Sequence, residues 1–582
     1  MINSNLNPLY PTISSLEDHS QPPQTPIPSL PNEIYAMIFE CSAPNNDISK
    51  LCGSRLVSRS WKHLIDCEIA QRFNLGHVSF KMLLTFLKIH ELFDSGSKKR
   101  VAKLISGLGE KLTYVNLKGI KFEYDILNEI TPICSNVTHL ELSDIDFRMI
   151  NSSFSSWQKL HTLVLERCKG FPNLKNNKNS LQHLNLKDCQ KIDYLDLSTF
   201  KSLNSLQIIP PFVEHSQLNL PESLESLNLK GLKHLTNKDL QTLVNNYQKL
   251  TSLEIKDVYI AEFSFKKLTK LRKLLLEDCW GLPDLSDNRT TLEHLVLNGC
   301  QNLTKVNLEC LEKVTHLEMN GTRYEQILYP PNLESLLLSH TPSQSFQIRH
   351  PHLKTFKLSS MRSDTRIDLD IRNCPALENL IIHDDRIRMI DASQCKHLKK
   401  IDCQMANTLT QLSITGCEAL EDIHLEHTQI ALLDFREFLH LKNLNIANNK
   451  QLKTFMIDGC RNLEMIVAYG RIIEQINLSG CVNLLEVDFS YTGLSVLDLR
   501  DCVNLQCLHI LDTSVKELNI SNQKFLKEFS GPVQTLHYAD HHYLVFLECP
   551  EMPMEKIDLK HFPNLMNYTF QDAKKLNKIS FP

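Results

Sequence analysis

Cysteine and histidine are the residues of this chain whose chemistry needs an explanation first. Among 582 residues there are 18 cysteines and 24 histidines, and such side chains can bind zinc, form disulfides or act as nucleophiles. Zinc fingers have closely paired cysteines, and no C-x-x-C pair with zinc-finger spacing occurs. We interpret His537, His541 and His542 as exposed loop histidines, since no carboxylate or thiol at ligand spacing supports a metal. The sequence also has no glycine-rich phosphate loop and no nucleophile elbow. It therefore predicts no metal, no cofactor, no catalytic residue and no enzyme activity.

The cysteines recur with a regular period. Cys168 is 21 residues from Cys189, and the same interval separates Cys279 from Cys300. This regularity predicts that the thiols fill one position in a repeated structure. No secretion signal precedes them, so we expect reduced, mostly buried thiols that pack as small apolar groups. The other cysteines assigned to this position are Cys374, Cys395, Cys417, Cys460, Cys481 and Cys502.

The segments that end in these cysteines read L-x-x-L-x-L-x-x-C, as at 160–168 and 292–300. Self-similarity at a period of 20–29 residues with this pattern is the signature of a leucine-rich repeat. The second and third leucines point inward from a short parallel strand, and the residue between them points outward. Stacked copies bury the apolar face that one copy cannot bury. Repeat-like segments run from residue 112 to 581, which predicts about 20 coils.

A second rhythm lies between the cysteine-bearing segments. Copies such as 484–489 and 505–510 alternate with them at intervals of about 10 or 11 residues. We interpret each 21-residue coil as having an extended segment on both faces, with a 3₁₀ or short-helix backing as the alternative. The spacing is irregular at 190–270 and 320–370, which predicts longer coils with a helix. One such helix is expected at 236–249, where Thr236 or Asn237 could cap its start.

Composition indicates no generic electrostatic partner. The net charge is −4, and we find no basic stripe of the kind that nucleic acids or membrane surfaces attract. No stretch is long and apolar enough to span a bilayer, and the first residues lack the pattern of a signal peptide. Residues 1–26 are rich in Pro, Ser, Asn and Gln, and we expect them to be disordered. The sequence thus predicts a cytoplasmic or nuclear protein with no nucleic-acid and no membrane partner.

The segment 27–72 has a different character. It contains LPNEI, then IF, then RLVSRSWKHLI, and this order and spacing resemble an F-box. With the repeats, the chain resembles the F-box/leucine-rich-repeat family. The predicted fold is therefore an α/β solenoid at 111–582 with a parallel β-sheet and short coils. A small all-α F-box precedes it, joined by a helical linker or N-terminal cap at 73–110. The resemblance implies that a Skp adaptor contacts Leu30, Pro31, Ile34, Ile38, Phe39, Leu56, Val57 and Trp61.

The resemblance implies a function as the substrate-recognition subunit of a Skp–cullin–F-box ubiquitin ligase. Its partners would be the Skp adaptor, through it the cullin-RING ligase, and a target protein. The stretch CSAPNNDISKL between the F-box helices lacks the usual leucine, which implies weaker adaptor affinity. One alternative is a helical cap on a scaffold that is not coupled to ubiquitin, since solenoids need their first edge covered. Others are a bacterial effector acting in a host cytoplasm, and a ligase with its own catalytic cysteine, for which the repeats leave no room.

The target surface is expected on the outward residues of the strands. Some of these residues are apolar, although strands also tolerate single apolar residues at exposed positions. The sequence is consistent with two interpretations: a binding site for a partner, or single apolar residues that the strands tolerate. The candidates for target binding are Val164, Leu275, Val296, Leu337 and Met456.

Overall fold

The computed structural model divides the chain into two compact units, residues 1–107 and 108–582. The F-box segment, the tail before it and the helical linker lie outside the described residues. The structure describes residues 113–118, 135–148 and 154–571, apart from gaps at 193, 210–216, 231–234, 262, 323, 340–345, 361–365, 453–454, 471–472 and 554–556.

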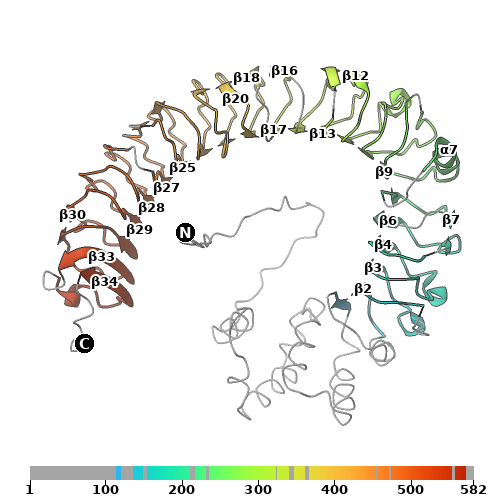
Figure 1. Ribbon diagram of the computed structural model, residues 1–582, viewed down its shortest axis with the longest axis horizontal. Coiled ribbons are helices and arrows are strands. Elements are labelled where there is room, and N and C mark those ends of the chain that lie inside the picture. Colours follow the sequence, from blue (N-terminus) through green and yellow to red (C-terminus); the bar gives the residue numbers. More distant parts are fainter. Residues whose placement is uncertain are drawn as a thin grey trace, which may run out of the picture. The chain divides into compact units, whose positions relative to one another are not determined.

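The described part of the second unit is a parallel β-solenoid. One 22-stranded sheet lines its inner face, which we call the concave face (Figure 1). Each strand pairs in parallel with the strand of the next coil, with Leu163 opposite Leu184, for example. In chain order the strands are β1 (Tyr114–Leu117), β2 (His139–Ser143), β3 (Thr162–Glu166), β4 (His183–Lys187), β6 (Ser205–Ile209), β8 (Ser226–Asn228), β9 (Ser252–Lys256), β10 (Lys273–Glu277), β11 (His294–Asn298), β13 (His316–Asn320), β15 (Ser335–Ser339), β17 (Thr355–Ser360), β19 (Asn379–Asp384), β21 (Lys400–Asp402), β23 (Asp422–His424), β25 (Asn443–Asn445), β27 (Met465–Val467), β28 (Glu486–Asp488), β29 (Cys507–His509), β31 (Glu528–Ser530), β33 (Phe546–Pro553) and β34 (Asn567–Gln571).

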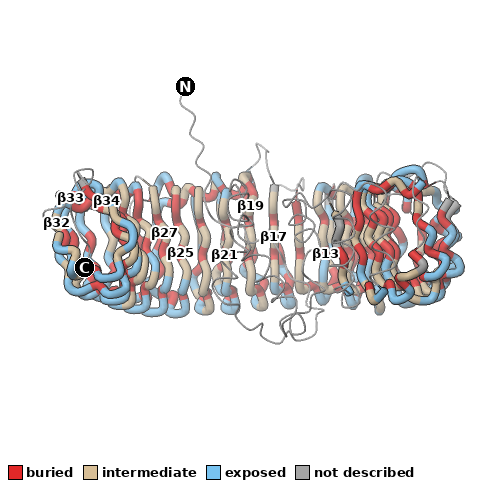
Figure 2. Tube along the Cα trace, turned by 90° about the horizontal axis from the view of Figure 1, so that it is seen from below, coloured by how far each residue is buried: buried red, intermediate tan, exposed pale blue. Residues whose placement is uncertain are grey.

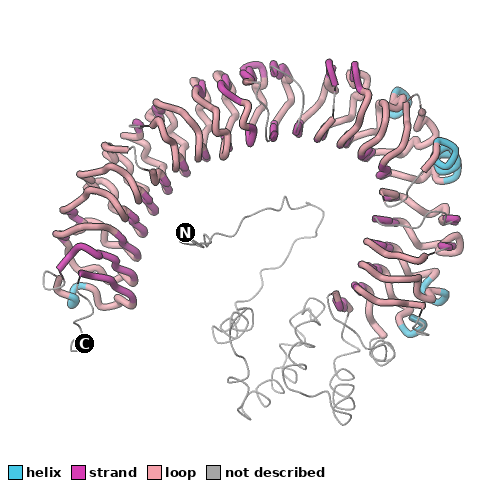
Figure 3. The backbone as a smooth tube through the Cα atoms, viewed as in Figure 1, coloured by secondary structure: helices cyan, strands magenta, loops and turns pink. Residues whose placement is uncertain are grey.

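The outer face of the coils, called the convex face below, carries shorter elements (Figure 3). Its strands form small parallel sheets of their own. The expectation of an extended segment on both faces therefore holds for many coils, whereas others have the 3₁₀ or helical backing that was the alternative. These strands are β5 (Tyr194–Asp196), β7 (Gln217–Asn219), β12 (Leu303–Asn307), β14 (Tyr324–Leu328), β16 (Phe346–Arg349), β18 (Ile367–Asn373), β20 (Ile387–Asp391), β22 (Gln411–Ser413), β24 (Leu433–Asp434), β26 (Phe455–Met456), β30 (Glu517–Asn519) and β32 (Thr535–His537).

One helix and a few 3₁₀ turns occupy other outer positions. The α-helix α7 (Asn237–Asn246) begins at the cap Thr236, whose hydroxyl accepts the backbone N–H of Asp239 in a capping box. The predicted helix at 236–249 is thus confirmed. No helix occurs in the described residues of 320–370, which contain strands instead. The prediction of a helix in this segment was therefore wrong. The 3₁₀ turns are η3 (Phe154–Ser156), η4 (Lys175–Asn177), η5 (Ser286–Asn288) and η7 (Leu559–His561).

Alternation along each concave strand builds the core. In β3, Leu163 and Leu165 are fully buried while Val164 between them is half-buried on the concave face. Neighbouring coils repeat this pattern, so the buried residues form a continuous interior and the exposed residues follow the edges of the coils (Figure 2). Removing one such leucine costs about 2–5 kcal/mol, because the packed neighbours cannot close the cavity.

The thiols form two series, which differs from the single position predicted. Cys168 and Cys279 follow concave strands β3 and β10, whereas Cys374 and Cys395 follow convex strands β18 and β20. Both series are buried, as expected, and their thiols are free. Their hydrogen bonds are alike, because the Cys189 thiol donates to the Leu165 carbonyl (3.4 Å) and the Cys395 thiol to the Ile371 carbonyl (3.3 Å). In either series the sulfur ties one coil to the coil before it.

Candidate protein-binding surface

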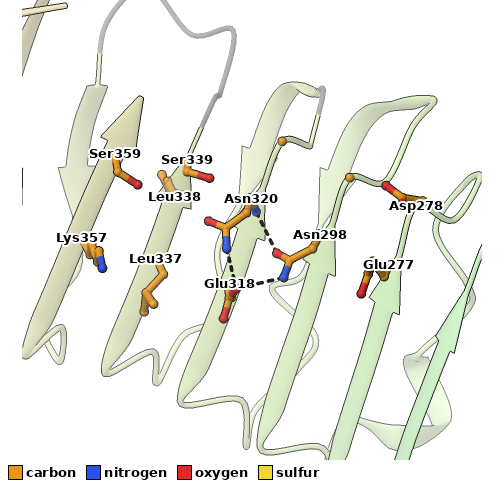
Figure 4. A pocket seen from close by; sticks show the side chains of 12 residues that line it. Glu277, Asp278, Asn298, Glu318, Asn320, Leu337, Leu338, Ser339, Lys357 and Ser359 are labelled. Atoms are coloured by element: carbon orange, nitrogen blue, oxygen red, sulfur yellow. Dashed lines mark hydrogen bonds between the residues drawn. The ribbon is translucent and has the colours of Figure 1, made fainter. Parts of the chain in front are cut away.

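A cavity of about 630 Å³ opens on the concave face over β10, β11, β13, β15 and β17. Its wall includes Glu277, Asn298, Glu318, Leu337 and Lys357 (Figure 4). These residues come from five consecutive strands, so the repeat itself places them side by side.

The Glu318 carboxylate is fixed by two amides at the centre of this surface. The Asn298 side-chain N–H donates to it at 2.9 Å, and the Asn320 side chain donates to the same oxygen. The Asn298 amide oxygen in turn accepts the backbone N–H of Asn320 at 3.0 Å. Figure 4 shows this network crossing the two strands. Because both amides remain neutral, the arrangement orients the carboxylate without cancelling its charge.

Glu277 lies at one end of the cavity, where two neighbouring lysines balance its negative charge. The ammonium groups of Lys256 and Lys230 lie 2.6 and 3.1 Å from its carboxylate oxygens. Burial raises the pKa of Glu277, but hydrogen bonds from Lys256 and Lys230 outweigh that effect and lower it overall. At Glu277 the negative charge is therefore balanced by lysines, whereas at Glu318 a negative charge is presented to a ligand.

The outward residues of the five strands form one row. Leu275 lies opposite Val296, Val296 opposite Glu318, Glu318 opposite Leu337 and Leu337 opposite Lys357. Adjacent strands are about 4.8 Å apart, so the row presents two apolar groups, an acid, an apolar group and a base over a short distance. Such alternation suits a protein segment that carries apolar and oppositely charged side chains. We call these five residues the concave row.

The structure places the predicted target-binding residues in three places. Leu275, Val296 and Leu337 share the concave row. Val164 occupies the same position in β3, well separated along the sheet. Met456 lies in convex strand β26, which pairs with β24 in a separate sheet, so it does not share the surface. Glu318 and Lys357 were not among the predicted residues, because only apolar outward residues were taken as candidates for target binding.

Histidines near this surface have structural roles. The rings of His294 and His316, in adjacent strands, stack with centroids 4.4 Å apart. Burial lowers the pKa of both rings, so they favour the neutral form. No metal-binding cluster of His, Cys, Asp or Glu occurs within the described residues. His541 is fully buried rather than exposed, which corrects that interpretation, whereas His542 lies at the surface.

Comparison with known proteins finds only distant similarity to solved structures. No family model matches the chain, and no curated protein matches it. Among solved structures, a Toll–Spatzle complex of Drosophila is 14% identical over 75% of this chain and 63% of that chain, with a TM-score of 0.49. A TLR13–ssRNA13 complex is 16% identical over 79% and 92%, with a TM-score of 0.42. A mouse RP105/MD-1 complex is 17% identical over 76% and 86%, with a TM-score of 0.42.

The chain's own repeats and sheet define its class. The described residues form a leucine-rich-repeat solenoid, an architecture whose extended concave surface is suited to holding other proteins. No helix among the described residues is long and apolar enough to cross a bilayer.

Proposed function

We propose that this protein is the substrate-recognition subunit of a Skp–cullin–F-box ubiquitin ligase. The observation that carries the proposal is the order LPNEI, IF and RLVSRSW at residues 30–61, in a chain whose later residues form a leucine-rich-repeat solenoid. The first segment docks on the Skp adaptor, and the solenoid holds a target protein.

The mechanism is tethering and needs no catalytic residue in this chain. A target held on the solenoid encounters the ubiquitin-loaded enzyme at a high effective concentration, which replaces a slow bimolecular step by a local one. A solenoid built from about 21-residue coils, each hydrogen-bonded to the next, supplies a rigid spacer for this purpose.

The concave row is the surface we assign to the target. It combines Leu275, Val296 and Leu337, all half-buried, with the fixed carboxylate of Glu318 and the ammonium of Lys357. Apolar contact supplies the binding free energy, and the two opposite charges set the orientation of the bound segment.

Binding to a purified Skp–cullin pair tests the proposal. We expect the full chain to bind, and the double variant Leu30→Ala, Pro31→Ala to bind at least about tenfold more weakly, because it removes two interface anchors. The matched control is Leu337→Asp, which alters the solenoid surface and should leave adaptor binding unchanged. Circular dichroism establishes that each variant is folded.

A folded wild-type chain that does not bind the pair would contradict the proposal. It would leave the alternative, a leucine-rich-repeat scaffold or effector that is not coupled to ubiquitin. Equal adaptor binding by the double variant would also contradict it, since the F-box residues would then have no part in docking.

A further inference from the structure

The concave row continues for one more strand and is bounded at both ends. Half-buried Ile381 in β19 extends it by another apolar group. Before the row, the outward position belongs to Glu254, whose carboxylate lies 3.3 Å from the Lys230 ammonium. After Ile381 it belongs to Asp402, whose carboxylate lies 3.0 Å from the His383 imidazole. Carboxylates that are paired within the sheet thus mark both ends of the row.

Two opposite charges inside the row have no counter-charge in the sheet. Among the described residues, neither Glu318 nor Lys357 has an ion-pair partner, although two amides fix the Glu318 carboxylate. Leu337 separates the two charged residues, since it lies opposite each of them on its neighbouring strands. Opposite charges attract and like charges repel across an interface. A complementary partner therefore presents a basic group, then an apolar group, then an acidic group on three successive strands.

The strands beneath the row are hydrogen-bonded on both sides. Strand β13 pairs in parallel with β11 and with β15, and β10, β11, β15, β17 and β19 are likewise paired with two neighbours each. An extended segment laid across the row cannot join this sheet as a further strand. Its own N–H and C=O groups would then face apolar side chains without partners, which is costly. A helix satisfies those groups internally, so the row favours a helical occupant.

The spacing of the strands also agrees with a helix. Neighbouring side chains of the row are about 4.8 Å apart, because they belong to adjacent strands. A helix with contact residues at heptad positions a and d presents one about every 5.3 Å, since seven residues rise about 10.5 Å. An extended segment presents side chains on one face about every 6.8 Å. The mismatch per strand is therefore about 0.5 Å for the helix and about 2 Å for the extended segment.

We propose that the target segment held by the solenoid is an amphipathic helix that lies across strands β10 to β19, an inference that rests on the proposed function. Its contact residues follow heptad spacing and are, in the direction from β10 to β19, apolar, apolar, basic, apolar, acidic and apolar. The cavity of about 630 Å³ over these strands receives the side chains of this face (Figure 4). Apolar contacts supply the binding free energy, and the ion pairs to Glu318 and Lys357 fix the register.

Designed peptides test this inference with the full chain. The probe is a fluorescent peptide of three heptads with high helix propensity, which carries Leu, Leu, Lys, Leu, Glu and Leu at its six contact positions. The swapped probe exchanges its Lys and Glu, and both probes are made in both orders, so that either direction of the helix is tested. Fluorescence anisotropy should show that wild type binds the probe, in one order, at least about tenfold more tightly than the swapped probe. Glu318→Lys, Lys357→Glu should reverse this preference.

Two controls separate helix and register from unspecific binding. A proline at a solvent-facing position in the middle of the probe leaves its contact residues unchanged but breaks the helix, and it should weaken binding at least about tenfold. Glu548→Lys changes a half-buried carboxylate at the outward position of β33, in the last coils, and should leave probe binding unchanged. Thermal unfolding shows whether each variant retains the fold.

Absence of probe binding by the folded wild type would overturn the inference, as would equal binding of the probes with and without proline. Equal binding of the probe and the swapped probe would overturn the assigned register, and equal weakening by Glu548→Lys would overturn the assignment to the concave row. These measurements need no adaptor. Their failure is therefore distinguishable from failure of the ubiquitin-ligase proposal, which binding to the Skp–cullin pair decides.

Discussion

The two ends of the solenoid share one repeat length but distribute their structure differently over its two faces. In the coils before residue 340, concave strands such as β10 have five residues, and the convex side often has a 3₁₀ turn such as η5. In the coils after residue 366, concave strands such as β23 have three residues, and convex strands such as β20 are common. The ten cysteines assigned to the repeat position follow the concave strands in the first region and the convex segments in the second.

The difference indicates that the buried position after a strand has the same structural role on the concave and the convex face. On the concave face, Cys279 occupies it in the first region and Asn449 in the second. Each side chain donates to the carbonyl of a residue in the preceding coil, namely Ile255 for Cys279 and Leu425 for Asn449. The position requires a small buried donor, and the repeat can supply it with sulfur, amide or hydroxyl.

The largest loss of stability is expected in a coil after residue 366, at the turn that leads from its concave strand to its convex strand. There Asp384 and Arg386 are buried and paired, with 2.7 Å between a guanidinium nitrogen and a carboxylate oxygen. Arg386→Ala leaves a buried carboxylate without its partner and should lower the free energy of unfolding by about 3–5 kcal/mol, as measured by urea denaturation. Arg436→Ala is the control, because its similar pair with Asp434 is exposed. Equal effects of the two changes would refute the role of burial.

An intermediate loss of stability is expected at the buried position after the concave strand, which the two regions fill with different side chains. The Asn449 amide donates to the Leu425 (2.9 Å) and Ile446 (2.7 Å) carbonyls, and its oxygen accepts from the Thr428 hydroxyl. Asn449→Ala should cost about 2–3 kcal/mol, because buried polar groups lose their partners. Asn449→Cys should cost less, since a thiol serves at this place in the first region. If cysteine is no better than alanine in urea denaturation, the two regions do not share an equivalent position.

A smaller, pH-dependent effect is expected at His541 in the last coils. Burial lowers the pKa of this imidazole, although the carbonyls of Gln523 and Ile520 partly oppose the shift. The unfolded chain then takes up its proton near the usual pKa of about 6.5 while the folded chain does not, so stability should fall as the pH drops below that value. The loss is about 1.4 kcal/mol for each unit between the two pKa values.

The control for this effect is His541→Gln, since Gln523 fills the same place in the preceding coil. The neighbouring Asp540–His561 pair (2.5 Å) lowers the pKa of Asp540 below that carboxyl's usual range, so its contribution is lost only in more acidic solution. Urea denaturation at pH 7.5 and about pH 5.5 should show a weaker pH dependence for the variant. An unchanged pH dependence would show that His541 is not the responsible group.

The smallest effect is expected in thiol reactivity, and it compares the two cysteine series directly. Cys310 is exposed, whereas Cys279 and Cys395 are buried, and burial raises the pKa of Cys395 to about 12. Alkylation at mildly basic pH followed by peptide mass mapping should modify Cys310 first and spare both series. Rapid modification of one series alone would show that the two faces are not equally closed.

The sequence predicted the repeat, its length and, for many coils, the extended segments on both faces, because leucine spacing reports directly on burial. It did not predict which face carries the cysteines, because half-coils of 10 or 11 residues look alike. One signal was present: Cys300 and Cys374 are 74 residues apart, about three and a half repeats of 21. Because of this additional half repeat, Met456 lies on the convex face instead of the concave face. The concave row was predicted only in part, because Glu318 and Lys357 gain meaning from neighbours in other coils.

The central claim is that one chain couples target capture to ubiquitin transfer. Its most direct test compares ubiquitylated proteins in a cell extract supplied with a Skp–cullin-RING ligase and with wild type, Leu30→Ala, Pro31→Ala, or Leu337→Asp. We predict that a set of proteins gains ubiquitin with the wild type and that both variants lose that same set, one through docking and the other through capture. A set that persists unchanged with either folded variant would contradict the account.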